Sequence, residues 1–203
     1  MKRLLSTLFC LLFVVAAFAQ ISNEHLKFMG IPLTGNIAQF QSKLVAKGCT
    51  LDKFLSANTP GGQRIFNGSF AGNKVRIVVF YNPQNKIVYR AKAILDGVSE
   101  DIAEQEYNKI KSLLSQKYGS DYMQIGESDG KESCSFLSLK SNYQDVDLGD
   151  ISNLSEVANG TIDVFILSDE EVWRRSPYNY NLHIDYNDMQ NNQQRNAEML
   201  EDL

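Results

Sequence analysis

The sequence predicts an α+β fold, in which an antiparallel sheet carries two main helices packed on one face. Two amphipathic helical patterns alternate with runs of β-branched and aromatic residues. Short turns separate several of these runs, and such neighbours pair antiparallel because parallel neighbours need a long crossover. With 43% hydrophobic residues among 203, the chain has enough apolar side chains for a core.

The segment 1–19 has the pattern of a secretory signal peptide. Lys2 and Arg3 precede an apolar run from Leu4 to Ala19, and residues 17–19, Ala-Phe-Ala, form an A-x-A cleavage site. The run is shorter than the roughly 20 apolar residues that a spanning helix needs. We therefore expect cleavage before Gln20, a periplasmic or extracellular location, and no integral membrane segment after cleavage.

Residues 34–48 predict the first helix. Thr34 or Asn36 can cap its start and Gly48 can end it. The apolar side chains that recur at helical spacing are Ile37, Phe40, Leu44 and Val45. Residues 56–64, SANTPGGQR, have the composition of a loop.

Residues 64–95 predict the first strands. Val75, Ile77 and Val79 occupy alternate positions, and the turn residues 82–85, NPQN, separate them from a second β-rich run at Ile87–Leu95. Three later strands are predicted at Ser133–Leu139, Gly160–Leu167 and Asn181–Tyr186.

Residues 99–119 predict the second and clearer helix. Ser99 can cap it, Glu100 and Asp101 favour the positive end of the helix dipole, and Gly119 can end it. One face is apolar and is expected to pack on the sheet. This face consists of Ala103, Tyr107, Ile110, Leu114 and Tyr118.

These elements predict a single domain over residues 20–188, with two candidate α-β-β units at 34–96 and 99–188. Each unit begins with a helix and continues into strands. Residues 189–203 are rich in Asn and Gln with sparse apolar positions. We expect this polar C-terminal tail to be a frayed helix or a disordered segment outside the domain.

Charge and cysteine content limit the classes of partner and the chemistry. Removal of Lys2 and Arg3 with the signal peptide takes the formal charge from −4 to −6, and an acidic chain without a basic patch is a poor candidate for nucleic-acid binding. Cys49 and Cys134 remain in the mature chain. In an exported protein they can form one disulfide or stay two buried thiols, and the sequence leaves both alternatives open.

The chain resembles a group of small exported proteins of unknown function from Bacteroides-like bacteria. The likeness lies in the order of several segments across residues 28–192: FMGIPLTGNIAQFQSKLVAKG, NGSFAGNKVRIVVF, VYRAKAIL, LLSQKYG and IDYND. The resemblance implies an exported α+β domain with a fold like that of β-lactamase-inhibitor proteins. It implies no catalytic residues, and a fold shared with an inhibitor does not imply inhibition.

No catalytic residue, cofactor site or metal site is predicted. A nucleophilic hydrolase needs a base beside an activated Ser or Cys, and the histidines are His25, in a lead expected to be flexible, and His183. Asp145, Asp147 and Glu156 occupy positions 1, 3 and 12 of a calcium-loop template. However, an aspartate stands where that template needs glycine, so a solvated acidic loop is favoured.

His183 and Asp185 lie in the stretch YNLHIDYNDMQNN, which at first suggests a metal or acid–base site. Strand alternation explains the pattern, because Leu182 and Ile184 then point to one face and His183 and Asp185 to the other. A metal would need a third ligand from another strand, and the sequence pattern identifies no residue for that role.

The best candidate contact surface is the aromatic and basic stretch EVWRRSPYNY, with Trp173, Arg174, Arg175 and Tyr178. Such residues anchor protein interfaces, although the same stretch is also typical of a hairpin connection whose Trp covers the core edge. We expect an exported, non-enzymatic binding or interaction domain for an unknown protein, peptide or envelope component. The alternatives are an enzyme that acts on envelope glycans with carboxylates alone, which needs two converging acidic side chains, and a purely structural scaffold.

Overall fold

The protein is described by a computed structural model that places residues 24–143, 154–169 and 179–201. In chain order the elements are β1 (Lys27–Phe28), β2 (Ile31–Pro32), α2 (Ile37–Ala46), β3 (Thr50–Leu51), α3 (Lys53–Asn58), β4 (Gln63–Phe70), β5 (Asn73–Tyr81), β6 (Val88–Val98), α4 (Glu100–Tyr118), β7 (Met123–Ser128), β8 (Lys131–Leu139), α5 (Leu154–Val157), β9 (Ala158–Ser168), β10 (Tyr180–Asp188) and α7 (Met189–Glu201). None of the helices in the described ranges combines the length and the apolar character that a membrane crossing requires.

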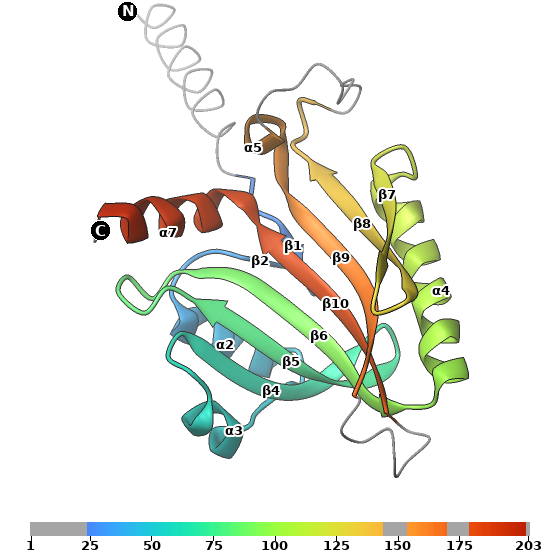
Figure 1. Ribbon diagram of the computed structural model, residues 1–203. Helices are drawn as coiled ribbons and strands as arrows, with labels where there is room; N and C mark the ends of the chain where they lie inside the picture. Colours follow the sequence, from blue (N-terminus) through green and yellow to red (C-terminus); the bar gives the residue numbers. More distant parts are fainter. Residues whose placement is uncertain (1–23, 144–153, 170–178, 202–203) are drawn as a thin grey trace, which may run out of the picture.

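Eight strands form one antiparallel sheet in the order β3-β4-β5-β6-β10-β9-β8-β7, and β1 pairs with β2 apart from it (Figure 1). The order is symmetric about its centre. The first half consists of α2 followed by β3–β6, with the short α3 inserted, and the second of α4 followed by β7–β10. The halves meet where β6 pairs with β10, with Ala93 opposite Ile184. The predicted α+β class with an antiparallel sheet is confirmed, and each half holds four strands rather than two.

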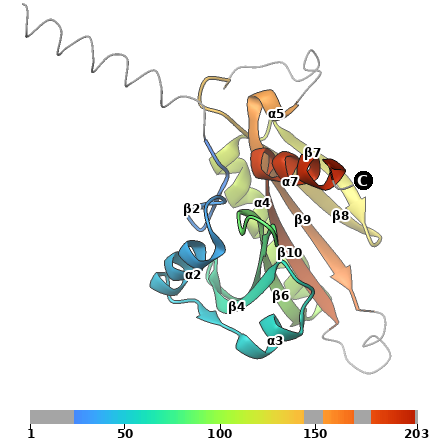
Figure 2. The same ribbon diagram turned by 90° about the vertical axis from the view of Figure 1, so that its left-hand side faces the viewer.

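The main core lies between the sheet and the helices α2 and α4, which cover the same face (Figure 2). The buried helical side chains are Ile37, Phe40 and Leu44 from α2 and Ala103, Tyr107, Ile110 and Leu114 from α4. These are positions that the helical period of the sequence selects, because residues three and four apart share one face. Val45 is the exception and is exposed.

The helix ends follow the capping pattern of the sequence in part. Asn36 caps α2, since its side-chain oxygen accepts a hydrogen bond from the backbone N–H of Ala38 at 2.8 Å. Ser99 occupies the cap position of α4 without a side-chain hydrogen bond. Gly119 ends α4 with a φ of 83°, in the left-handed region that favours glycine.

The opposite face of the sheet is partly covered by α3. This helix begins before the loop predicted at residues 56–64 and includes the first three residues of that loop. Asp52 caps this helix by accepting a hydrogen bond from the Leu55 N–H at 2.9 Å. Leu55 packs against a second, smaller cluster of buried side chains on β4, β5 and β6, namely Ile65, Val78 and Ile94. Both faces of this half of the sheet are therefore apolar, which explains why Val78 is buried between the core positions Ile77 and Val79.

The segment after Asp188 is helical, which is one of the two alternatives expected for the polar tail, but it is docked on the domain rather than separate from it. It forms α7, which crosses the end of the face opposite α2 and α4 (Figures 1 and 2). Asn191 donates its side-chain N–H groups to the Leu33 and Val88 carbonyls at 2.8 and 3.1 Å. Glu198 accepts hydrogen bonds from Asn82 at 2.6 Å and from Asn85. The sequence pattern missed this docking because these contacts are polar and join residues far apart.

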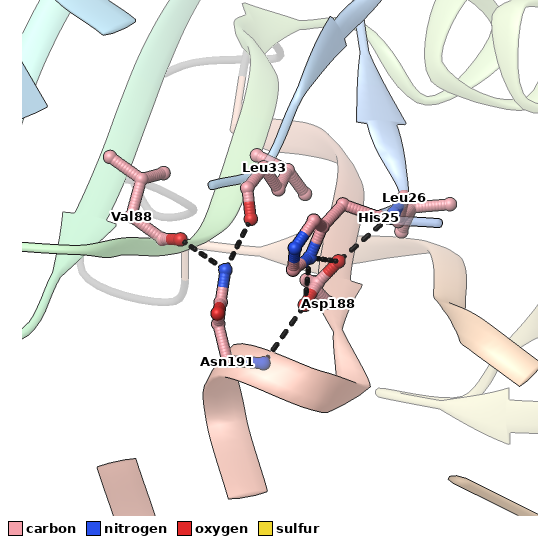
Figure 3. A network of polar contacts seen from close by, with 6 residues as sticks. All are labelled: His25, Leu26, Leu33, Val88, Asp188 and Asn191. Carbon is pink, nitrogen blue, oxygen red and sulfur yellow. Dashed lines mark hydrogen bonds and ion pairs between the residues drawn. The ribbon is translucent and has the colours of Figure 1, made fainter. Parts of the chain in front are cut away.

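Asp188 joins both ends of the described chain (Figure 3). Its carboxylate is fully buried and accepts hydrogen bonds from the backbone N–H groups of Leu26 and Asn191, each at 2.9 Å. The Nδ1 atom of His25 lies 3.1 Å from the same carboxylate. His25 is thus held against the domain rather than in the flexible lead that the sequence suggested.

Cys49 and Cys134 are free, buried thiols, so the disulfide alternative is not realised. Cys49 lies against Gly68, where an added Cβ would meet its sulfur at 2.7 Å. Cys134 lies on β8, facing Val164 of β9. Burial raises the pKa of each thiol.

Candidate functional site

The candidate site lies on the sheet face opposite α2 and α4, where polar side chains line neighbouring strands. Strand alternation sends one set of residues into the core and the next set to this face. The register then aligns four strands in one row: Lys92 on β6, Asp185 on β10, Asp163 on β9 and Ser135 on β8. This alignment cannot be read from the sequence, because it depends on which strands pair.

Asp185 is the best-anchored member of the row. Its side chain is almost fully buried and accepts hydrogen bonds from two nitrogens of the Arg90 guanidinium, with the Nε atom at 2.8 Å. The Lys92 Nζ atom lies 3.0 Å from the same carboxylate. The hydrogen bond to Asp185 raises the pKa of Arg90. A buried carboxylate needs such partners, because an unpaired one has a large desolvation penalty.

Asp163 stands directly opposite Asp185 and has weaker partners. It accepts a hydrogen bond from the Ser135 hydroxyl at 2.6 Å and a long one from Thr161 at 3.5 Å. Burial raises its pKa, and the negative charge of neighbouring Asp185 raises it further. The two adjacent carboxyl groups therefore have different surroundings. Asp185 has two cationic partners, whereas the hydrogen-bond donors to Asp163 among the described residues are hydroxyl groups.

His183 packs on this face as part of an aromatic stack. Its ring lies parallel to the Phe165 ring with centroids 5.0 Å apart, and the Lys92 Nζ atom lies 5.3 Å from the Phe165 centroid. Burial lowers the pKa of His183 to about 4, with a further contribution from Lys92. Its cross-strand neighbours are Phe165 and Ile94, which cannot bind a metal. No group of three His, Cys, Asp or Glu residues in the described ranges can hold a metal ion.

A cavity of about 560 Å³, which we call the sheet cleft, opens where this face meets α7. Its floor includes Arg90, Asp163, Asp185 and Asn187, its aromatic side chains include Phe80 and Tyr89, and α7 contributes Asn192 and Arg195. The guanidinium carbon of Arg195 lies 4.8 Å from the Tyr89 ring centroid, and that of Arg90 lies 4.8 Å from the Phe80 centroid. The cleft thus combines aromatic rings, paired charges and amide groups.

Most of the sequence-predicted site residues lie outside the part of the chain that the structure describes. Trp173, Arg174, Arg175 and Tyr178 lie outside the described residues, as do Asp145 and Asp147. Glu156 lies in the short helix α5. The predicted contact surface and the predicted solvated acidic loop therefore both stay predictions.

Sequence reasoning placed Asp185 on the correct polar face of its strand but missed its partners. The alternation of Lys92 with Ala91 and Ala93, and of Asp163 with Ile162 and Val164, marks polar faces. That signal could have identified Lys92 and Asp163 as surface-facing residues. It could not have shown that they lie beside Asp185, nor that Arg195 reaches the cleft from the C-terminal helix.

Comparison with known proteins found no family model, no curated protein and no solved structure that matches the chain. The resemblance to exported Bacteroides-like proteins and to the β-lactamase-inhibitor fold stays a prediction.

Proposed function

We propose that this protein is an exported, non-enzymatic binding domain that holds an envelope component in the sheet cleft. The export part rests on the signal-peptide pattern of residues 1–19. The binding part rests on the cleft, whose volume of about 560 Å³ lies in the range of small-ligand sites. Its lining is mostly polar and also includes the aromatic rings of Phe80, Tyr81 and Tyr89.

One observation carries the proposal: the cleft contains polar groups whose hydrogen-bonding capacity is not used within the described protein. The side-chain oxygen of Asn187 is buried and has no hydrogen-bond partner among the described residues. The Arg195 guanidinium makes one long hydrogen bond, to the Asn192 side chain at 3.5 Å. Arg195 is partly buried and lines the cleft, so its remaining N–H groups can donate to a ligand. The buried Asn187 oxygen reaches a ligand after a change of its side-chain rotamer, which would supply its missing partner.

A capture experiment tests this proposal. The mature protein, immobilised and incubated with solubilised native envelope, is expected to retain a component that an Arg195→Gln variant retains much less. The matched control is Lys43→Gln, which makes the same kind of charge change on the exposed surface of α2, on the other side of the sheet. Equal capture by both variants would exclude the cleft as the binding site. Loss of capture in a Trp173→Ala variant alone would favour the predicted aromatic and basic stretch instead.

The second candidate function is a carboxylate-dependent enzyme that acts on envelope glycans. It is favoured by the direct cross-strand pairing of Asp163 and Asp185 at the cleft and by the raised pKa of Asp163. A carboxyl group with a raised pKa suits a proton donor to the leaving oxygen, and a second carboxylate suits the stabilisation of positive charge on the sugar. An assay for new reducing ends in envelope glycan, with Asp163→Asn as the comparison, separates the two candidates. Release of reducing ends that disappears in Asp163→Asn supports the enzyme. Capture of an envelope component without release of reducing ends supports the binding domain.

A further inference from the structure

We propose that the ligand of the sheet cleft is an acidic oligosaccharide whose sugar carboxylate is bound by Arg195. This inference rests on the proposed binding function and specifies its ligand. Arg195 differs from Arg90 and Lys92 in how its hydrogen-bond donors are used.

Arg90 and Lys92 are already engaged with Asp185. The Arg90 guanidinium donates two hydrogen bonds to that carboxylate, and Lys92 forms an ion pair with it. Arg195 has no carboxylate partner among the described residues, and its one hydrogen bond goes to the neutral side chain of Asn192. Arg195 is therefore the cation of the cleft whose charge a ligand can neutralise.

The geometry of Arg195 leaves its donors accessible to such a ligand. The guanidinium carbon lies 4.8 Å from the centroid of the Tyr89 ring, so the ring supports the cation. The N–H groups lie in the plane of the guanidinium, in the fork arrangement that matches a carboxylate with two parallel hydrogen bonds. A lysine at this place would be a less directional partner.

Arg195 is also held in place before any ligand arrives. Asn191, one turn earlier on α7, donates hydrogen bonds to the Leu33 and Val88 carbonyls. Glu198, one turn later, accepts hydrogen bonds from Asn82 and Asn85. A helix fixed on both sides of the arginine reduces the conformational entropy that binding must remove.

The other groups of the cleft fit the rest of a sugar. The buried side-chain oxygen of Asn187 lacks a partner among the described residues, and a change of its rotamer would let it accept a hydrogen bond from a sugar hydroxyl group. Phe80 and Tyr89 supply apolar surface for the C–H groups of a sugar ring.

Two other ligand classes fit less well. An extended peptide would add its backbone to an exposed strand edge, but the cleft floor is formed by β6, β10 and β9, which are internal strands with neighbours on both sides. A nucleic acid needs several cations along its phosphate backbone, and Arg195 is the one cleft cation without a carboxylate partner among the described residues. A small saccharide requires only the side chains that the cleft presents.

Calorimetric titration with two trisaccharides tests the inference: trigalacturonate, which carries carboxylates, and maltotriose, which is neutral. Trigalacturonate is expected to bind the mature protein and the Lys43→Gln control equally. Arg195→Gln should weaken this binding by at least about tenfold, as expected for loss of a charged hydrogen-bonding partner. The affinity should also fall as salt rises, because the interaction is ionic. Matching thermal unfolding of the variant and the parent would show that the substitution leaves the fold intact.

Three outcomes would overturn the inference. Equal affinity for the two sugars would show that the carboxylate is not recognised, while the binding function of the cleft would stand. Unchanged trigalacturonate binding in Arg195→Gln would exclude Arg195 as its partner. Failure of both sugars to bind would reject the acidic-saccharide class, and the envelope-capture experiment would still decide the proposed function separately.

Discussion

Substitution of Asp188 by alanine should destabilise the protein strongly. The Asp188 side chain is 0% exposed and accepts hydrogen bonds from the backbone of Leu26 and Asn191 and from the His25 ring. Its removal leaves the buried Leu26 N–H without a partner, which costs roughly 1–3 kcal/mol. It also removes the side-chain cap at the start of α7, at about 1 kcal/mol. We therefore expect the free energy of unfolding to fall by about 3 kcal/mol.

Urea denaturation followed by circular dichroism measures this change. The matched control is Asp96→Ala, which removes an exposed carboxylate paired with Arg76 and should reduce stability by less than about 1 kcal/mol. Hydrogen exchange adds a local readout, since the Leu26 amide should lose protection in Asp188→Ala. A loss of stability no larger than that of Asp96→Ala would refute the reasoning that Asp188 ties the two ends of the domain together.

Three further predictions concern the core and the titrating groups. Gly68→Ala should destabilise the protein by about 1–3 kcal/mol, because the new Cβ would lie 2.7 Å from the Cys49 sulfur. A second substitution, Cys49→Ala, should recover part of the lost stability. Absence of any recovery would count against this contact as the cause. Between pH 6.5 and about 4 the unfolded chain binds a proton at His183 that the folded protein does not bind, so stability should fall as the pH decreases through this range. Chemical denaturation at several pH values should show that the free energy of unfolding falls less with decreasing pH in His183→Gln than in the parent protein. An identical dependence of stability on pH in the two proteins would contradict this prediction. The native mature protein, which lacks Cys10, should react slowly with a thiol reagent. After unfolding it should expose two reactive thiols, Cys49 and Cys134, without prior reduction. A mass increase of two hydrogens on reduction would instead reveal a disulfide.

Local sequence patterns predicted the two main helices and most strands because their causes are local. The period of Phe40 and Leu44 in α2, and of Tyr107 and Leu114 in α4, marks a buried face whatever the helix packs against. The cap at Asn36 involves a residue two positions away. The short elements α3 and β7 were missed, because the first was obscured by the loop composition that follows it and the second has mostly exposed side chains.

The candidate site depended on contacts between distant residues, which no local pattern contains. Asp185 and Arg90 are 95 positions apart, and His25 and Asp188 are 163 apart. Their proximity follows from strand order and register, which place β6 beside β10 and the N-terminal segment beside the start of α7. A polar tail and a lone histidine looked unstructured in sequence because their stabilising partners are hydrogen-bonding groups rather than an apolar stripe.

The sequence by itself determined the α+β class, the amphipathic faces of α2 and α4 and the polar side of β10, because periodicity records which side of an element is buried. Only the tertiary structure decided that Cys49 and Cys134 stay apart, that Asp163 lies beside Asp185, and that α7 places Arg195 over Tyr89. The physical reason is that periodicity states which face is buried but not what lies against it. Strand pairing and helix docking bring separate segments together, and the charges and hydrogen bonds of the sheet cleft exist only after they meet.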